Sequence, residues 1–342
     1  MDARTTWPAL LSALIRGDSL TADESEWAMN EIMEGAATPS QIAGFGVALR
    51  IKGTSVAELT GLARSMLAHA TPISVPGQLT DLVGTGGDGA RTVNVSTMGT
   101  IVAAAAGARM IKHGNRAASS SCGAADLLEA LGVALELDAA GVARCIEEAG
   151  IGFCFAPRFH PALRHAGPAR RELAIPTTFN FLGPLANPAR ARRQLVGVSD
   201  PSMADLMLGV LAARGSKHVL LVHGHDGLDE LTTTTTSTVH ELDDGDMRTW
   251  VLDPQDVGIP LAKAEDLRGG DPATNAAIAR AVLAGETGPP RDVVLLNAGA
   301  ALVAAGTAVS VADGIALAAK SIDEGKAGAA LDRLVAVSSS AL

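Results

Sequence analysis

A glycine-rich segment follows the first apolar run of the sequence that could form a strand. It reads GTGGDGART, from Gly84 to Thr92, and a run of small residues typical of a helix begins shortly after it. Glycines let backbone amides approach an anion closely, and the first amides of the following helix carry free N–H groups and partial positive charge. The segment therefore predicts a phosphate or diphosphate site, to which Asp88, Asn94 and Ser96 would add polar side chains.

Two other interpretations of this segment stay open. GTGGDG also fits the bare GxGxxG pattern of dinucleotide-binding proteins, which carry an acidic residue at the end of the second strand, about twenty residues on. In this chain the second strand would end in Lys112 and His113, which argues against a dinucleotide. The other interpretation is a tight turn that binds nothing, but it does not explain why polar side chains gather in one loop.

Positive charge is concentrated after the next apolar run. Residues 109–116 include three Lys and Arg residues, in a chain of 342 residues whose net charge is −10. In an acidic protein such a concentration indicates an anion site, although a solvated basic turn would look the same. The segment continues through serines 119–121 to Gly123 and Ala124, whose amides open the next helix and could hold a terminal phosphate.

Two adjacent carboxylates, Asp229 and Glu230, follow another apolar run. On a loop they could present several oxygens to Mg²⁺, a hard cation that often shares its oxygen ligands with substrate phosphates. An ordinary acidic surface turn is the alternative. Zinc is disfavoured, because the nearby His223 and His225 would project to opposite sides of an extended chain and the oxygen-rich surroundings suit a hard cation.

A fourth group of candidates lies in the proline-rich segment 157–190. Arg170 could form paired hydrogen bonds with a carboxylate beside apolar and proline surfaces, as binding of a flat aromatic acid requires. Arg170 and Arg171 could instead flank or cap a helix. His160, which precedes a proline, fits a structural role better than a catalytic one.

The elements that position these groups fall into two parts. Over residues 1–74, apolar residues recur with helical spacing and segments begin with capping signals, such as Thr21 with Glu24. Further on, short apolar runs alternate with helical patterns, which is typical of a mostly parallel sheet covered by helices. We therefore expect an α/β protein, with a small all-helical domain over residues 1–74 and a large α/β domain over residues 75–342. The segment from about 163 to 188 is expected to pack back on the helical domain.

The expected strands and helices follow from the same patterns. Strands are expected at 81–83, 109–112, 152–155, 195–198 and 219–222, then a hairpin of 239–242 and 248–252. Helices are expected at 96–106, 124–131, 139–149, 202–214, 272–284 and 310–324. Because open α/β sheets bind ligands at the carboxyl ends of their strands, the loops described above should lie together.

The composition excludes several classes of function. The negative net charge, with three Trp, six Phe and no Tyr, argues against nucleic-acid and anionic-membrane partners. No apolar run is long enough to cross a bilayer, and no secretory signal is visible. The three cysteines lack paired spacing, which favours a reduced, cytoplasmic setting.

Taken together, a series of segments in fixed order resembles the anthranilate phosphoribosyltransferase family. The segments are GTGGD, NVST, KHGNRAAS, FAPRFHP, RREL, TFNFLGPLANP and DGLDELTTTTTS. The helical block and the remaining α/β region are also similar, so the resemblance covers nearly the whole chain. It implies a Mg²⁺-dependent pentosyltransferase of tryptophan biosynthesis that joins anthranilate to 5-phosphoribosyl 1-diphosphate (PRPP) and releases pyrophosphate. It also implies a fold shared with pyrimidine nucleoside phosphorylases.

The resemblance assigns three sets of site residues. PRPP would be bound by Gly84, Gly87, Asp88, Thr92, Asn94, Val95, Ser96, Thr97, Lys112, His113, Gly114, Asn115, Arg116, Ala117, Ala118, Ser119, Ser120 and Ala124. Anthranilate would be held by Gly84, Asn115, His160, Arg170 and Pro184, and one or two Mg²⁺ ions by Ser96, Asp229 and Glu230. Lys112, His113 and Arg170 would act by electrostatics and positioning, and a homodimer formed through the helical domain is implied.

The sequence departs from the family pattern at three positions. Ala124 replaces the usual Ser or Gly, Phe159 replaces a frequent Tyr, and Ala186 replaces a usual Thr. A backbone contact at position 124 would survive this change. Two alternatives are a nucleoside phosphorylase of the same fold and a non-catalytic relative that binds nucleotides or nucleic acid. The Arg170 region argues against the first, and the acidic composition argues against the second.

Overall fold

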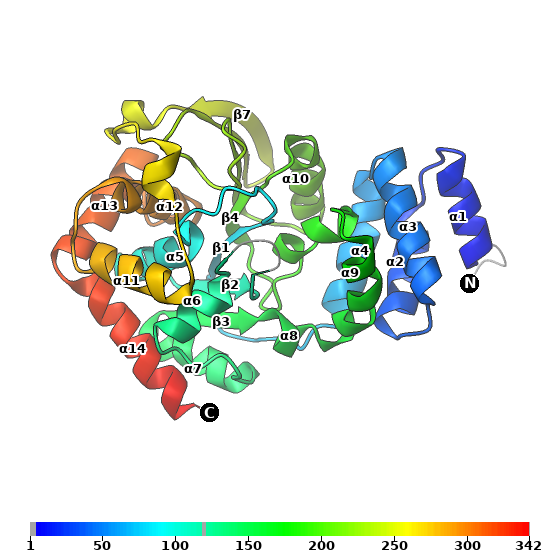
Figure 1. The fold of residues 1–342 in the computed structure, drawn as a ribbon, viewed down its shortest axis with the longest axis horizontal. Helices are drawn as coiled ribbons and strands as arrows, with labels where there is room; N and C mark the ends of the chain where they lie inside the picture. Colours follow the sequence, from blue (N-terminus) through cyan, green and yellow to red (C-terminus); the bar gives the residue numbers. More distant parts are fainter. Residues whose placement is uncertain (1–4, 118–120, 342) are drawn as a thin grey trace.

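The computed structural model describes residues 5–117 and 121–341, and its amino-terminal part is helical (Figure 1). The four helices of this part are α1 Trp7–Ile15, α2 Ala22–Met33, α3 Pro39–Lys52 and α4 Val56–Ala68. Each begins after a Thr or Ser whose hydroxyl accepts a hydrogen bond from an amide of the first turn. In α2, α3 and α4 a Glu or Gln side chain also accepts a bond from the amide of the capping residue. The capping signals therefore mark true helix starts.

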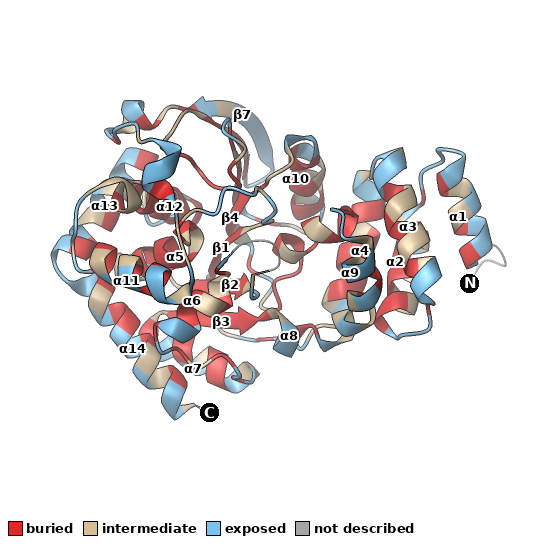
Figure 2. Cartoon of the chain, viewed as in Figure 1, coloured by how far each residue is buried: buried red, intermediate tan, exposed pale blue. Residues whose placement is uncertain are grey.

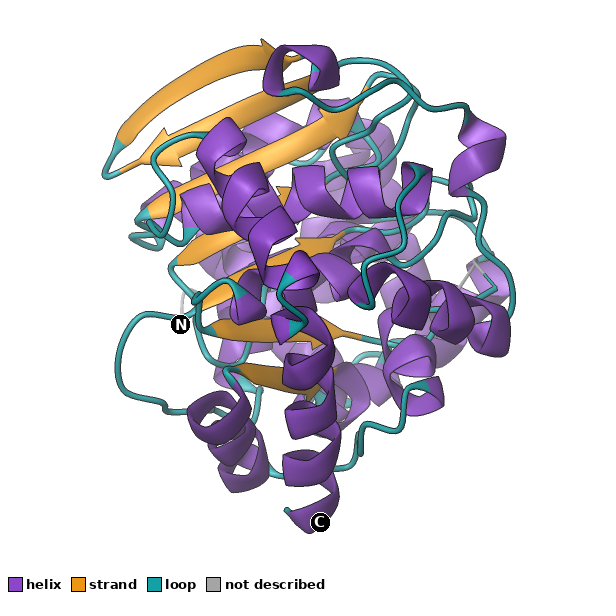
Figure 3. Ribbon diagram, turned by 90° about the vertical axis from the view of Figure 1, so that its left-hand side faces the viewer, coloured by secondary structure: helices purple, strands orange, loops and turns teal. Residues whose placement is uncertain are grey.

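A seven-stranded sheet of order β3-β2-β1-β4-β5-β6-β7 forms the centre of the larger part (Figure 3). Five strands are parallel, namely β1 Thr80–Gly84, β2 Met110–Gly114, β3 Ile151–Phe155, β4 Arg193–Gly197 and β5 His218–Gly224. An antiparallel hairpin, β6 Ser237–Asp243 and β7 Asp246–Leu252, extends one edge. The expected mostly parallel sheet with a late hairpin is confirmed.

Helices cover the sheet, and most lie close to their predicted positions. These are α5 Val95–Ala105, α6 Ala124–Ala130, α7 Ala139–Ala149, α10 Ala204–Ala213, α11 Pro272–Leu283 and α13 Val311–Asp323. The sequence patterns missed two further helices, α12 Pro289–Ala304 and α14 Lys326–Ser340. In α12, 12 of the 16 residues are buried, so the helix lacks the polar face that would have revealed it. In the described ranges, no helix is long and apolar enough to cross a membrane.

The buried side chains form two cores, and neighbouring residues of one strand, such as Leu82 and Val83, belong to different cores. Figure 2 shows buried positions both in the helical part and around the sheet. One core joins the sheet to α5, α7 and the carboxy-terminal helices. The other joins α1 to α4 with α10, with residues 166–186 and with sheet residues such as Val83, Val196 and Leu221. In this second core α4 contacts α10, and α3 contacts the short helix α9, Gly167–Leu173. The helical part and the sheet therefore share one apolar interior beside the ends of β1 and β4.

Candidate active site

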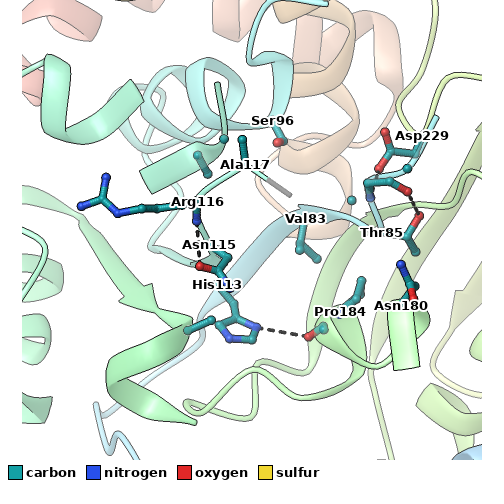
Figure 4. Close-up of a pocket in the computed structure, with 18 of the residues that line it drawn as sticks. Val83, Thr85, Ser96, His113, Asn115, Arg116, Ala117, Asn180, Pro184 and Asp229 are labelled. Atoms are coloured by element: carbon teal, nitrogen blue, oxygen red, sulfur yellow. Dashed lines mark hydrogen bonds between the residues drawn. The ribbon is translucent and has the colours of Figure 1, made fainter. Parts of the chain in front are cut away.

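A cavity of about 410 Å³ opens where the strand order reverses between β1 and β4 (Figure 4). Such a reversal is where open α/β sheets bind ligands, outside the carboxyl ends of the strands. One end of the cavity is polar and is lined by the loops after β1, β2 and β5. The other end is largely apolar and is lined by Met66, Leu163, Ala166, Phe179, Leu182 and Pro184.

The glycine-rich loop after β1 is shaped by backbone conformations that other residues rarely adopt. Gly86, Gly87 and Gly89 have φ angles of 69°, 86° and 71°, and the loop leads to the amino terminus of α5. Close approach matters as well, because a Cβ added at Gly84 would lie 2.3 Å from Asp229 Oδ2. At Gly197, an added Cβ would lie 1.6 Å from the Asp229 carbonyl oxygen. Glycine at these two strand ends lets the acidic loop lie directly against the glycine-rich loop.

The two carboxylates of the acidic loop are buried at this junction. The amide of Gly86 donates to Asp229 Oδ2 at 2.6 Å, and the amide of Ser96 donates to Glu230 Oε1 at 3.1 Å. Burial raises the pKa of Asp229 well above its usual value, and the nearby Glu230 and Asp88 raise it further. Burial also raises the pKa of Glu230 to about 7, although Lys112 opposes this effect.

This acid pair fits a divalent cation. Glu230 Oε2 is buried and has no hydrogen-bond partner among the described residues, so a strong acceptor lies unused beside a second carboxylate. Two buried negative groups repel each other, and a hard cation with oxygen ligands would relieve that repulsion. The structure thus brings together Ser96, Asp229 and Glu230, the residues that sequence analysis assigned to Mg²⁺.

Lys112 lies in the middle of β2, near the acid pair, and lines the cavity. Its Nζ donates to the carbonyl oxygen of Leu82 at 2.7 Å, and the side chain is buried. Burial lowers the pKa of Lys112, whereas Asp81, Glu230 and Asp229 raise it. The ammonium group is therefore held at a fixed point in a water-poor setting, where its charge acts strongly on a bound anion.

The loop after β2 is closed by Asp126 of α6. Asp126 Oδ2 accepts hydrogen bonds from the amides of Ala117 and Gly123, both at 2.9 Å. The Gly123 amide therefore already has a hydrogen-bond partner in this structure, and phosphate binding at Gly123 stays a prediction. Arg116 forms ion pairs with Asp126 and Glu129, and its side chain points away from the cavity in Figure 4. Only the backbone of Arg116 is left to face a ligand.

His113 is a neutral group in this site. Its Nδ1 lies 3.1 Å from the carbonyl oxygen of Gly183, to which it donates, and Nε2 is buried without a partner among the described residues. Burial, and then the neighbouring His160, lower the pKa of His113 to about 3. The ring is thus a hydrogen-bond acceptor at Nε2 and a poor general base at neutral pH.

Arg170 of α9 lines the apolar end of the cavity. In the described ranges, its guanidinium group has no hydrogen bond or ion pair, and burial lowers its pKa. A half-buried cation without a partner, beside Phe179 and Pro184, suits a planar ligand with a carboxylate. Asn115 lies across the cavity at the end of β2.

Most of the predicted site residues surround this one cavity. The lining includes Gly84, Gly87, Asp88, Thr92, Asn94, Val95, Ser96, Lys112, His113, Gly114, Asn115, Arg116, Ala117, Ala124, Arg170, Pro184, Asp229 and Glu230. Two described residues lie behind the lining. Thr97 is buried in α5, and the ring of His160 lies 5.0 Å from that of His113, tilted by 52°, and donates from Nε2 to the Ala186 carbonyl oxygen. Ala118, Ser119 and Ser120 lie outside the described residues.

Sequence reasoning missed the residues that brace the polar end. Asn275 of α11 donates from Nδ2 to Asn94 Oδ1 at 2.8 Å, and Asn94 in turn donates to the Cys122 carbonyl oxygen at 2.9 Å. These bonds join the loops after β1 and β2 to a helix more than 150 residues away in the sequence. The sequence shows only an isolated Asn at position 275 within a predicted helix, and local spacing does not identify the partner of this residue. Asp126 was missed as well, although its partners Gly123 and Ala117 lie only three and nine residues away.

Comparison with known proteins defines the class of this chain. Residues 8–70 match the family model "Glycosyl transferase family, helical bundle domain", and residues 76–328 match "Glycosyl transferase family, a/b domain". Together the two matches cover both parts of the fold, and residues from both ranges line the cavity. The chain is thus a member of a glycosyltransferase family with a helical bundle and an α/β domain.

Individual relatives narrow this class. The chain is 58% identical over 335 residues to the anthranilate phosphoribosyltransferase of Thermobifida fusca, with 96% of each chain covered. The crystal structure of the enzyme from Thermus thermophilus superposes with a TM-score of 0.91 at 44% identity, covering 96% of this chain and 99% of that one. The Saccharomyces cerevisiae enzyme in complex with PRPP and Mg gives 0.90 at 28% identity, covering 99% of both chains. In complex with 4-fluoroanthranilate it gives 0.88 at 26% identity, covering 98% of this chain and 99% of that one. This chain belongs to the anthranilate phosphoribosyltransferase family.

Proposed function

We propose that this protein transfers the 5-phosphoribosyl group of PRPP to the amine of anthranilate, with release of pyrophosphate, in tryptophan biosynthesis. The observation that carries the proposal is the division of the cavity. One end offers a glycine-rich loop, a helix amino terminus and a buried acid pair. The other offers a guanidinium in an apolar wall that has no partner among the described residues. A diphosphate sugar fits the first end and an aromatic acid fits the second.

Ser96, Asp229 and Glu230 are the residues that would hold Mg²⁺, consistent with the yeast enzyme that binds PRPP and Mg. When bound, the ion neutralises charge on the diphosphate and so improves it as a leaving group. We propose that the site holds one or two Mg²⁺ ions. The chain's own donors complement this charge: the amides of the glycine-rich loop and of the first turn of α5 face the same end of the cavity.

Breaking the bond between C1 and the diphosphate places positive charge on the ribose and negative charge on the departing group. Amides and an ammonium group that are already fixed in place stabilise the departing group without reorganisation in the transition state. Lys112 meets this requirement, because its Nζ is anchored to the carbonyl oxygen of Leu82. Closure of the site against water would strengthen each of these interactions.

The nucleophile is the neutral amine of anthranilate, which already carries a lone pair and needs no strong base. Arg170 would orient the carboxylate of anthranilate, Asn115 would contact the ligand from the other side, and Gly84 and Pro184 would line its path. The pKa of about 3 makes His113 an unsuitable proton acceptor at neutral pH, so the proton would leave late, to solvent or to pyrophosphate. His160 would support the His113 ring from behind rather than touch anthranilate.

The loss of anthranilate fluorescence in the presence of PRPP and Mg²⁺ tests this function. We expect consumption that requires all three components, with formation of phosphoribosyl-anthranilate confirmed by mass spectrometry. Phosphate-dependent release of uracil or thymine from nucleosides, without consumption of anthranilate, would favour the nucleoside phosphorylase alternative. A salt-dependent shift of DNA in a gel, with no product from anthranilate, would favour the non-catalytic alternative.

A homodimer formed through the helical part belongs to the same proposal. Ile15 at the end of α1 and Ile51 near the end of α3 are exposed apolar side chains on that part of the surface. Light scattering after gel filtration would measure the mass, and substitution of both residues by Lys should favour the monomer. The cytoplasmic setting and the lack of nucleic-acid and membrane partners also stay predictions.

A further inference from the structure

Asn297 lies in the middle of the apolar helix α12 and is fully buried. A buried side-chain amide without hydrogen-bond partners would destabilise the protein. The hydrogen bonds that Asn297 forms therefore indicate its role. Asn297 Oδ1 accepts from the amide of Leu231 at 3.0 Å, and Nδ2 donates to the carbonyl oxygens of Leu231 at 2.8 Å and Val293 at 2.9 Å. The side chain therefore binds both backbone groups of a single residue in a distant loop.

Leu231 directly follows the acid pair in the sequence. Paired bonds to its amide and carbonyl groups fix both the position and the direction of the chain at that point. The residue is itself buried, so water cannot readily replace the amide of Asn297. Asn297 thus acts on the chain immediately after Glu230.

The rest of the acidic loop is held by other means. Asp226 accepts bonds from the amide of Leu228 and from the hydroxyls of Thr232 and Thr234, which folds the loop upon itself. These bonds are internal to the loop and do not join it to a neighbouring element. The bonds from Asn297 instead join its centre to α12, one of the helices that pack on the sheet.

We propose that Asn297 is a positioning residue for the acid pair and sets the affinity of the site for its divalent ion. It holds Leu231 so that Asp229 stays against the amide of Gly86 and Glu230 stays at the amino terminus of α5. The role of the ion in turnover rests on the proposed function, but the positioning of the loop does not. Residues that orient metal ligands in this way typically contribute a factor of about 10 to 100 in metal affinity.

The test compares Asn297→Leu with Leu302→Ala. Asn297→Leu keeps the size of the side chain and removes all three hydrogen bonds. Leu302→Ala is the matched control, because Leu302 is fully buried on the same helix and its truncation destabilises the core without removing a hydrogen bond to Leu231. Both proteins are purified full length and compared with wild type by thermal unfolding.

Two readouts do not depend on turnover. The first is hydrogen exchange of the Leu231 amide in the metal-free protein, which Asn297→Leu should accelerate by about tenfold or more. The second is binding of Mn²⁺ in the presence of PRPP, followed by the electron paramagnetic resonance signal of free Mn²⁺. Its dissociation constant should rise by about 10- to 100-fold in Asn297→Leu. It should stay within about twofold of wild type in Leu302→Ala.

Steady-state kinetics distinguish a loss of metal positioning from a general loss of stability. In Asn297→Leu the Mg²⁺ concentration for half-maximal rate should rise, while KM for anthranilate stays within about threefold of wild type. Wild-type Mn²⁺ binding in a folded Asn297→Leu protein, or an equal loss in Leu302→Ala, would overturn the proposal. If Asn297→Leu does not fold, Asn297→Ser decides by the same Mn²⁺ titration, in which an unchanged constant overturns the proposal. Failure of the wild type to consume anthranilate would refute the proposed function and leave the two binding readouts valid.

Discussion

The two ends of the cavity are built in different ways. The polar end consists of short loops at the ends of neighbouring strands, and hydrogen bonds join these loops to one another. The amide of Gly86 binds Asp229, that of Ser96 binds Glu230, and Asn94 joins the loops after β1 and β2. The apolar end is lined by side chains from α4 and from residues 156–184, with Arg170 unpaired among the described residues.

This difference indicates that the two ends of the cavity contribute to different parts of the reaction. Fixed amides and buried charges suit a step in which charge develops, because little must move when the bond breaks. An apolar wall with one cation selects a ligand by shape and by its carboxylate. Changes at the polar end should therefore affect turnover and the Mg²⁺ requirement, and changes at the apolar end should affect the use of anthranilate.

Removal of the acid pair should have the largest effect. Asp229→Asn combined with Glu230→Gln should lower kcat/KM by about 1000-fold or more, because a buried charged interaction with the ion is lost. Steady-state rates over a Mg²⁺ titration measure this change. Asp243→Asn with Asp244→Asn is the control, because these adjacent carboxylates lie at the end of β6 and in the turn before β7, away from the cavity, and the Mg²⁺ titration should match that of wild type. An unchanged Mg²⁺ titration in the first variant would remove the acid pair from the site.

Substitution of Arg170 should affect the binding of anthranilate and not that of PRPP. Arg170→Ala should raise KM for anthranilate by about 100-fold, since a charge-assisted pair with the carboxylate is lost. KM for PRPP should change by less than about threefold, because Arg170 lies at the other end. Arg171→Ala is the matched control, as Arg171 is the adjacent exposed arginine of α9. Equal effects of the two substitutions would contradict the assignment.

The neutral state of His113 predicts a dependence of stability on pH. Burial lowers the pKa of His113 to about 3, so between about pH 6.5 and pH 5 the unfolded chain takes up a proton that the native protein does not. Acid should therefore favour unfolding, by about 2 kcal/mol over this interval from His113 alone. Urea unfolding at both pH values should show that His113→Gln loses about that much less stability than wild type. An equal loss would show that His113 is protonated in the native protein.

Arg116 should give the smallest effect. Its ion pairs with Asp126 and Glu129 are half-exposed, and such pairs contribute about 1 kcal/mol or less. Arg116→Ala should raise KM for PRPP by less than about fivefold. Asp126→Asn should cost more, because Asp126 also accepts hydrogen bonds from the amides of Ala117 and Gly123. A large effect of Arg116→Ala on PRPP alone would mean that the side chain turns into the cavity.

The polar end was largely predictable from sequence, because its parts are local. Gly84 and Asp229 belong to segments that directly follow apolar runs, and the carboxyl ends of parallel strands meet at one edge. The apolar end was less predictable, because the role of Arg170 depends on packing between α4 and residues 156–184. The residues alone suggested a carboxylate partner for Arg170 but left a helix-flanking role open, and the family resemblance favoured the first. For His160 the residues alone favoured a structural role, whereas the family resemblance assigned it to anthranilate. Spacing cannot decide between these roles, because it does not separate a lining residue from one behind it.

The residues that brace the site were the hardest to predict. Asn297 lies 66 residues from its partner Leu231, inside a helix too thoroughly buried to show a polar face. Asn275 is similarly distant from Asn94. Nothing in the local pattern of either amide identifies its partner, so their roles become visible only in the folded chain.

A crystal structure of this protein with PRPP, Mg²⁺ and 4-fluoroanthranilate tests the division of the cavity most directly. The account predicts the diphosphate on the amides of the glycine-rich loop and α5, the ion on Asp229 and Glu230, and the carboxylate of the aromatic ligand on Arg170. A carboxylate bound at Lys112, or a diphosphate placed against Arg170, would contradict it.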